Sequence, residues 1–190
     1  MNVNLKLVLV AVLLASVCGF AANIEIWSDD MSSLDDWTVS SPDNVGLIDG
    51  NTKVQLNSWW GANGNTGYLS RGTGELIQDE TEYVAIFLVD SFSDGKDITI
   101  SVTDVDNGGA DIATAAATLN GNGAEYTLDF STVGTENDAV VGNEMGVYVN
   151  GGWWKNFAVD NIKIEQVPEP ASMIMLGAGG IGLLARRRKS

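Results

Sequence analysis

The residue types available for chemistry are restricted, because the 190-residue chain contains 25 acidic residues, no histidine and a single cysteine. Without histidine it has no Ser-His-Asp or Cys-His machinery and no histidine-ligated zinc. Glycoside hydrolysis needs only two carboxylates about 5–10 Å apart, but with so many acids chance pairs are certain, and none lies in a recognisable motif. We therefore expect a protein that is not an enzyme, with a small secreted glycan-active enzyme as a further alternative.

Tryptophan is the residue type that most suggests a ligand. Six occur in the chain, and two pairs are adjacent, Trp59-Trp60 and Trp153-Trp154. An indole ring packs against the C–H face of a sugar, and the nearby Asn57 and Asn150 can contact hydroxyl groups. On a strand, one ring of each pair would face outward. The predicted carbohydrate contacts are therefore Trp59, Trp60, Trp153, Trp154, Asn57 and Asn150. The alternative is that the tryptophans pack in the core or are incidental rings on the surface.

The first 21 residues are typical of a secretory signal peptide. Lys6 precedes the apolar run from Leu7 to Val17, and Gly19-Phe20-Ala21 provides a small-x-small site for signal peptidase after Ala21. The run is shorter than the roughly 20 residues that span a bilayer. The only cysteine, Cys18, lies within this segment, so the mature domain is expected to contain no disulfide.

The C-terminus has three features in fixed order. Val167-Pro168-Glu169-Pro170-Ala171-Ser172 comes first, the apolar stretch from Met173 to Ala185 follows, and Arg186, Arg187, Arg188 and Lys189 come next. The apolar stretch can enter a bilayer as a short transmembrane helix, and the basic cluster stays cytoplasmic by the positive-inside rule. The main domain is then on the other side, in agreement with the signal peptide.

This order closely resembles the PEP-CTERM sorting signal. The resemblance implies that Pro168, Glu169 and Pro170 form the recognition tripeptide and that Arg186, Arg187 and Arg188 form the stop. It further implies processing by exosortase, a transpeptidase-like membrane enzyme of Gram-negative bacteria that make extracellular polysaccharide. The protein would then be held transiently in the inner membrane before it reaches the cell surface or is secreted. The alternative is an ordinary tail anchor.

The middle of the chain is strongly acidic. Residues 22–167 contain 24 acidic and 5 basic residues, a formal charge of −19. Such a surface repels nucleic acid and anionic membranes and favours divalent cations. Abundant aromatic and β-branched residues argue against disorder, so we expect a folded domain.

The middle of the chain also has the hydrophobic pattern of β-strands. Ile98, Ile100 and Val102 alternate with polar residues, and similar runs recur between Asn/Gly turns. Residues 83–89 are uniformly apolar and predict a central strand buried on both faces. Residues 112–119 are predicted as a strand rather than a helix. In the last run the apolar parity changes near Asp160-Asn161, which predicts a bulge. The pattern indicates an all-β, two-sheet antiparallel sandwich.

The ending Phe157-Ala158-Val159-Asp160-Asn161-Ile162-Lys163-Ile164 resembles the closing strand of galactose-binding-like jelly rolls, a fold shared by many carbohydrate-binding modules. The resemblance implies a structural calcium ion between the first and last strands, held by Glu25 or Asp29 with Asp160. The alternative is that these carboxylates are solvated or cap turns. Residues 104–109 begin like an EF-hand loop, but Ala115 occupies the final ligand position, so we expect a hairpin turn there.

The sequence therefore predicts a signal peptide at 1–21, a β-sandwich domain at 22–166 and a sorting tail at 167–190. We expect an exported, non-enzymatic protein of the cell surface or extracellular matrix. The alternative function is a carbohydrate-binding module for extracellular polysaccharide.

Overall fold

A computed structural model describes residues 22–40, 45–57, 67–92, 95–134, 137–151 and 156–168. The predicted signal peptide and the predicted membrane helix of the tail lie outside these residues. No helix within the described ranges is both long and apolar enough to cross a membrane. Residues 24–166 form one compact unit.

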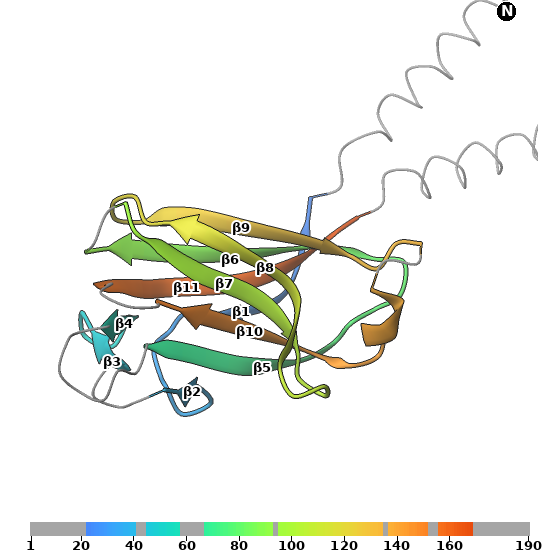
Figure 1. Cartoon of the computed structure of the whole chain (residues 1–190), viewed down its shortest axis with the longest axis horizontal. Coiled ribbons are helices and arrows are strands. Elements are labelled where there is room, and N and C mark those ends of the chain that lie inside the picture. Colours follow the sequence, from blue (N-terminus) through green and yellow to red (C-terminus); the bar gives the residue numbers. More distant parts are fainter. Residues whose placement is uncertain are drawn as a thin grey trace, which may run out of the picture. The chain divides into compact units, whose positions relative to one another are not determined.

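The described strands form two antiparallel sheets, as the sequence predicts (Figure 1). Sheet A contains β1 (Ile24–Asp29), β3 (Val45–Ile48), β4 (Lys53–Asn57), β6 (Glu82–Ser91), β9 (Ala124–Ser131) and β11 (Asn156–Val167), and its order is β3-β4-β11-β6-β9 with β1 paired to β11. Sheet B contains β2 (Thr38–Val39), β5 (Tyr68–Leu76), β7 (Asp97–Asp104), β8 (Ala110–Thr118) and β10 (Glu144–Asn150), in the order β2-β5-β10-β7-β8. A single 3₁₀ turn, η1 (Asp138–Val140), precedes β10 among the described residues.

The core lies between the two sheets and contains one face of each. Ile98, Ile100 and Val102 are at most 1% exposed, which confirms the predicted alternation in β7. They belong to the same hydrophobic cluster as Tyr83 and Phe87 of β6 in the opposite sheet. Burial of such apolar side chains stabilises the fold by about 1.5–3 kcal/mol each. The sandwich is therefore held by interdigitated aliphatic and aromatic residues, without a disulfide.

The last strand, β11, lies inside sheet A and not at its edge. Its first part pairs with β4 and its second part with β1, while β6 is a further neighbour. Phe157 and Val159 are fully buried, and so are Ile162 and Ile164. The buried positions thus change parity across Asp160-Asn161, as the sequence predicts. The change occurs where β11 exchanges β4 for β1 as its partner.

Two predictions about individual strands can be compared with the structure. Residues 112–119 fall mostly in β8, which confirms a strand there, and residues 105–109 form the turn between β7 and β8. The expectation that residues 83–89 are buried on both faces is wrong. They lie in an interior strand, β6, but Val84, Ile86 and Leu88 are only half-buried. The reason is that the outward face of sheet A borders solvent, as is usual in antiparallel sandwiches.

Two phenylalanines close together in the sequence test the core. Phe87 is fully buried in β6, whereas Phe92, directly after this strand, is 50% exposed. We expect Phe87→Ala to lower the free energy of unfolding by about 3–5 kcal/mol, because it leaves a cavity between the sheets. Phe92→Ala should change it by less than about 1 kcal/mol. Urea unfolding of both variants measures the difference, and equal losses would contradict the proposed core.

Candidate functional site

The outward surface of sheet B carries a continuous set of uncharged polar side chains. We call it the tyrosine face and define it by six residues of three adjacent strands: Tyr68, Ser70, Thr99, Ser101, Tyr148 and Asn150. Their neighbours in the sequence, such as Leu69, Ile100 and Val149, are buried in the core. Because side chains alternate along a strand, the six residues lie on the outward side of the sheet, where Ser101 is fully buried and the other five are exposed or half-buried.

The strand register arranges these residues in two rows across the sheet. Tyr148 of β10 lies between Ser70 of β5 and Ser101 of β7. Asn150 of β10 lies between Tyr68 and Thr99 in the same way. Figure 1 shows β5, β10 and β7 running side by side, so the two rows cross adjacent strands.

The two tyrosines of the face contact each other. Their ring centroids are 5.6 Å apart and their planes are tilted by 36°. The Asn150 side chain donates a hydrogen bond of 2.8 Å to the Tyr148 hydroxyl, and Ser101 donates one of 2.9 Å to Thr114 in β8. Burial raises the pKa of Tyr148, so its hydroxyl stays protonated and neutral near pH 7. The arrangement offers half-buried aromatic rings beside hydroxyl and amide groups.

The outward surface of sheet A carries charges of both signs. On β9, Asp129 is paired with Val84 and Glu125 with Leu88. On β11, Lys163 forms an ion pair of 2.8 Å with Glu165. The tyrosine face contains none of the 24 acidic residues of the domain, although its six residues share their strands with several of them.

Sheet A also contains a small ionic cluster on three neighbouring strands. Lys53 of β4 donates a hydrogen bond to Asp90 of β6 and lies 3.7 Å from Asp160 of β11. The hydrogen bond with Lys53 lowers the pKa of Asp90 and raises that of Lys53. Asp90 also accepts a hydrogen bond of 2.6 Å from the Gly123 amide. Both groups are therefore charged at neutral pH, and the cluster links β4 and β6 across β11.

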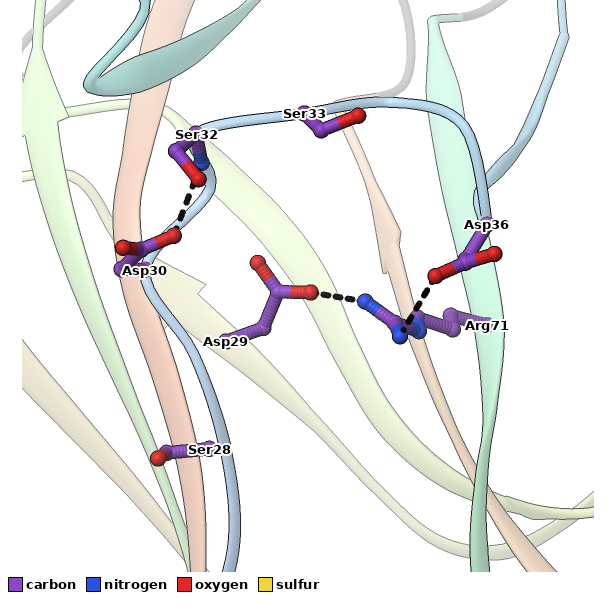
Figure 2. A pocket seen from close by; sticks show the side chains of 7 residues that line it. All are labelled: Ser28, Asp29, Asp30, Ser32, Ser33, Asp36 and Arg71. Atoms are coloured by element: carbon purple, nitrogen blue, oxygen red, sulfur yellow. Dashed lines mark hydrogen bonds and ion pairs between the residues drawn. The ribbon is translucent and has the colours of Figure 1, made fainter.

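An open depression of about 330 Å³ lies beside the start of the domain and is lined mainly by serine and aspartate around Arg71 (Figure 2). Figure 2 shows the Asp29 and Asp36 carboxylates directed at the Arg71 guanidinium, while Asp30 turns toward Ser32. Arg71 also lies over the rings of Trp27 and Trp37, 5.8 and 5.9 Å from their centroids. Arg71 belongs to sheet B and Asp29 to sheet A, so this contact joins the two sheets.

The residues predicted to bind calcium have other contacts in the structure. Asp29 accepts hydrogen bonds from Arg71, from the Trp37 indole at 3.2 Å and from the Met31 amide at 2.7 Å. Glu25 accepts one from Ser28, and Asp160 lies beside Lys53. Within the described ranges, no group of three or more aspartate, glutamate, histidine or cysteine side chains is arranged to hold a metal. The calcium site stays a prediction that no geometry here supports.

Only some of the predicted carbohydrate contacts are described. Trp59, Trp60, Trp153 and Trp154 lie outside the described residues. Asn57 ends β4 opposite Asn156, and Asn150 belongs to the tyrosine face. Sequence reasoning missed Tyr68 and Tyr148, although the alternation of Tyr148 and Asn150 with buried Val147 and Val149 could have identified an outward tyrosine.

The tryptophan-containing segments 58–66 and 152–155 connect described residues that are themselves paired. Segment 58–66 follows Asn57 and segment 152–155 precedes Asn156. These two asparagines are opposite each other in sheet A. At the other ends, the Gly151 amide donates a hydrogen bond of 3.0 Å to the Gly67 carbonyl. Both segments therefore join the same corner of sheet A to the same corner of sheet B, next to Tyr68 and Asn150.

The sorting tail begins directly at the end of β11. Gln166 is still paired with Ile24 of β1, and Pro168 follows two residues later. Glu169, Pro170, Arg186, Arg187 and Arg188 lie outside the described residues. In comparison with known protein families, residues 166–189 match the PEP-CTERM protein-sorting motif. The chain carries a PEP-CTERM sorting motif. This finding confirms the predicted resemblance and identifies an exported protein that is sorted by exosortase.

Among curated proteins, no sequence matches this chain. Several solved structures share its fold. BiXyn10A CBM1 in its apo form has a TM-score of 0.55 at 13% identity, covering 75% of this chain and 98% of its own. The CBM22-1 xylan-binding domain of Paenibacillus barcinonensis Xyn10C has a TM-score of 0.50 at 13% identity, covering 78% and 97%. A Stig cyclase of Fischerella sp. TAU, in complex with an indole compound, has a TM-score of 0.50 at 11% identity, covering 77% and 99%.

At these identities the comparisons show the fold alone. They confirm that the chain contains a β-sandwich of the kind found in carbohydrate-binding jelly rolls. Because a cyclase has a similar fold, the fold does not decide between binding and catalysis.

The Arg71 contacts predict a specific loss of stability. The Asp29 side chain is only 9% exposed and the Arg71 side chain 24%. We expect Arg71→Met to lower the free energy of unfolding by about 2–3 kcal/mol, somewhat below the 3–5 kcal/mol of a fully buried pair, because Asp29 loses its cation. Lys163→Met breaks a more exposed ion pair and should cost about 0–1 kcal/mol. Thermal unfolding compares the two, and equal effects would contradict the role assigned to Arg71.

Proposed function

We propose that this exosortase-sorted protein binds extracellular polysaccharide through the tyrosine face and is not an enzyme. The observation that carries the proposal is the contact between Tyr68 and Tyr148, with Asn150 bonded to the Tyr148 hydroxyl on the same outward surface. Before processing the protein is held in the inner membrane by its tail, and afterwards it acts at the cell surface or in the secreted matrix.

The chemistry of the face suits sugars. Sugar rings present C–H groups that pack on aromatic rings, and their hydroxyls exchange hydrogen bonds with amide and hydroxyl groups. Tyr68 and Tyr148 supply the rings, while Asn150, Ser70 and Thr99 supply polar groups in neighbouring rows. The face belongs to a rigid sheet, so its side chains are ordered before the ligand arrives, which lowers the entropic cost of binding.

Two further observations support the proposal. The fold is shared with a module named as xylan-binding, although identity is low. In the acidic depression, Asp29 is ion-paired with Arg71 and hydrogen-bonded to Trp37, so it is not a free general acid or base. A glycan-active enzyme would instead need two facing carboxylates with matched protonation states. Release of reducing ends from a polysaccharide by the purified protein would favour that alternative.

Substitution of the tyrosines tests the binding site. We expect Tyr148→Ala and Tyr68→Ala each to weaken retardation in polysaccharide affinity gels by about tenfold or more, because each sugar-stacking ring contributes about 1–3 kcal/mol, as hot-spot aromatic residues do. Phe92→Ala, which removes an exposed aromatic ring outside the face, should leave retardation unchanged. Circular dichroism confirms that the variants are folded. Full binding by both tyrosine variants would contradict the proposal.

Substitution of the sorting tripeptide tests the route to the surface. In a variant with alanine at Pro168, Glu169 and Pro170, we expect the protein to stay in the membrane fraction at unprocessed mass. Pro42→Ala, at the only other proline, should be processed normally. Mass spectrometry of membrane and released fractions distinguishes these outcomes. An intact Arg186–Lys189 end on the released wild-type protein would contradict processing.

A further inference from the structure

The three strands that carry the tyrosine face, together with the adjoining β8, contain mainly acidic charges. Outside the six residues of the face, β5, β7, β8 and β10 contain five acidic residues and one basic residue: Glu75, Asp97, Asp104, Asp111, Glu144 and Arg71. The basic residue is Arg71, and its guanidinium is bound by Asp29 and Asp36. It points to the core side of the sheet, on the same parity as buried Leu69. No described cation of these strands is therefore directed at the tyrosine face.

Several acidic residues lie on the strands around the face. Asp111 is exposed at the start of β8 and contributes to the electrostatic environment of Tyr148. Asp97 accepts a hydrogen bond of 2.6 Å from the Thr118 hydroxyl. The base nearest to these strands in sequence is Lys96, which directly precedes Asp97. The whole domain has a formal charge of −19, so its long-range field is negative as well.

From this charge distribution, and resting on the proposed function, we infer that the tyrosine face selects uncharged polysaccharides and rejects those built from uronic acids. A uronate carboxylate at the face would be desolvated against tyrosine rings, and no cation of the described strands β5, β7, β8 and β10 is directed at it, which is unfavourable. It would also be repelled by the field of the domain during approach. A neutral sugar needs only the hydroxyl and amide partners that the face supplies.

Ionic strength separates the two ligand classes. Salt screens the repulsion between exposed charges, since the Debye length falls from about 30 Å at 0.01 M to about 8 Å at 0.15 M. Binding of a neutral chain should therefore be almost independent of salt. Any binding of a uronate chain should be weakest at low salt, opposite to the behaviour of a site that uses lysine or arginine.

The test is native affinity electrophoresis of the full chain in a non-ionic detergent with EDTA present. Glucomannan and mixed-linkage β-glucan serve as neutral probes, and alginate and polygalacturonate as anionic probes, each at 10 and 150 mM NaCl. We expect at least one neutral probe to retard the protein, and this retardation should change less than about twofold with salt. The retardation should be lost in Tyr148→Ala. The anionic probes should not retard the wild-type protein.

A matched pair of charge variants sharpens the test. Thr99 is exposed on the tyrosine face, and Thr127 is exposed on the outward side of β9 in sheet A. Thr99→Lys should bring about retardation by alginate at 10 mM NaCl, whereas Thr127→Lys, with the same change in net charge, should not.

The possible failures can be told apart. Retardation of the wild-type chain by alginate at 10 mM NaCl, as strong as that by the neutral probes and lost in Tyr148→Ala, overturns the inference and leaves polysaccharide binding in place. Retardation by none of the four probes overturns the proposed function together with the inference.

Discussion

The pairing of β11 inside sheet A is the interaction on which the rest of the structure depends. This last strand pairs with β4 over its first residues and with β1 over its last, and it supplies four fully buried side chains to the core, Phe157, Val159, Ile162 and Ile164. Because its partners come from positions far earlier in the chain, the sandwich cannot be completed until the C-terminus is available. High sequence separation of this kind slows folding, and the sorting tail follows within two residues of the last pair.

This arrangement places the first and last strand residues of the sandwich side by side. Ile24, close to the predicted signal-peptidase site, is opposite Gln166, which already belongs to the matched sorting motif. At the other end of β11, Asn156 is opposite Asn57, near Tyr68 and Asn150 of the tyrosine face. The start of the matched sorting motif and this corner of the tyrosine face therefore lie at opposite ends of a twelve-residue strand.

Much of the fold could be predicted, because strand alternation is a local signal. The parity of Ile98, Ile100 and Val102 predicts their burial, and the parity change after Val159 predicts an irregular last strand. The partial exposure of Val84, Ile86 and Leu88 on the outward face could not be predicted, since apolar composition alone does not tell whether a second layer covers a sheet. The sorting motif was fully visible, because its signal is a linear order of proline, apolar and basic residues.

The candidate site was harder to predict because it depends on register between strands that are distant in sequence. Nothing local indicates that Tyr68 and Tyr148, eighty residues apart, bring their rings within 5.6 Å. The contacts of the carboxylates predicted to bind calcium could not be foreseen for a similar reason: only the folded chain reveals that Asp29 faces Arg71 and that Asp160 lies near Lys53.

The central claim is that the outward face of sheet B, and not that of sheet A, contacts the polysaccharide. Amide chemical-shift mapping with a neutral oligosaccharide tests it most directly. The account predicts that the largest shifts occur at residues 68–70, 99–101 and 148–150. Shifts concentrated at residues 84–90 and 160–165, with the tyrosine face unchanged, would contradict it.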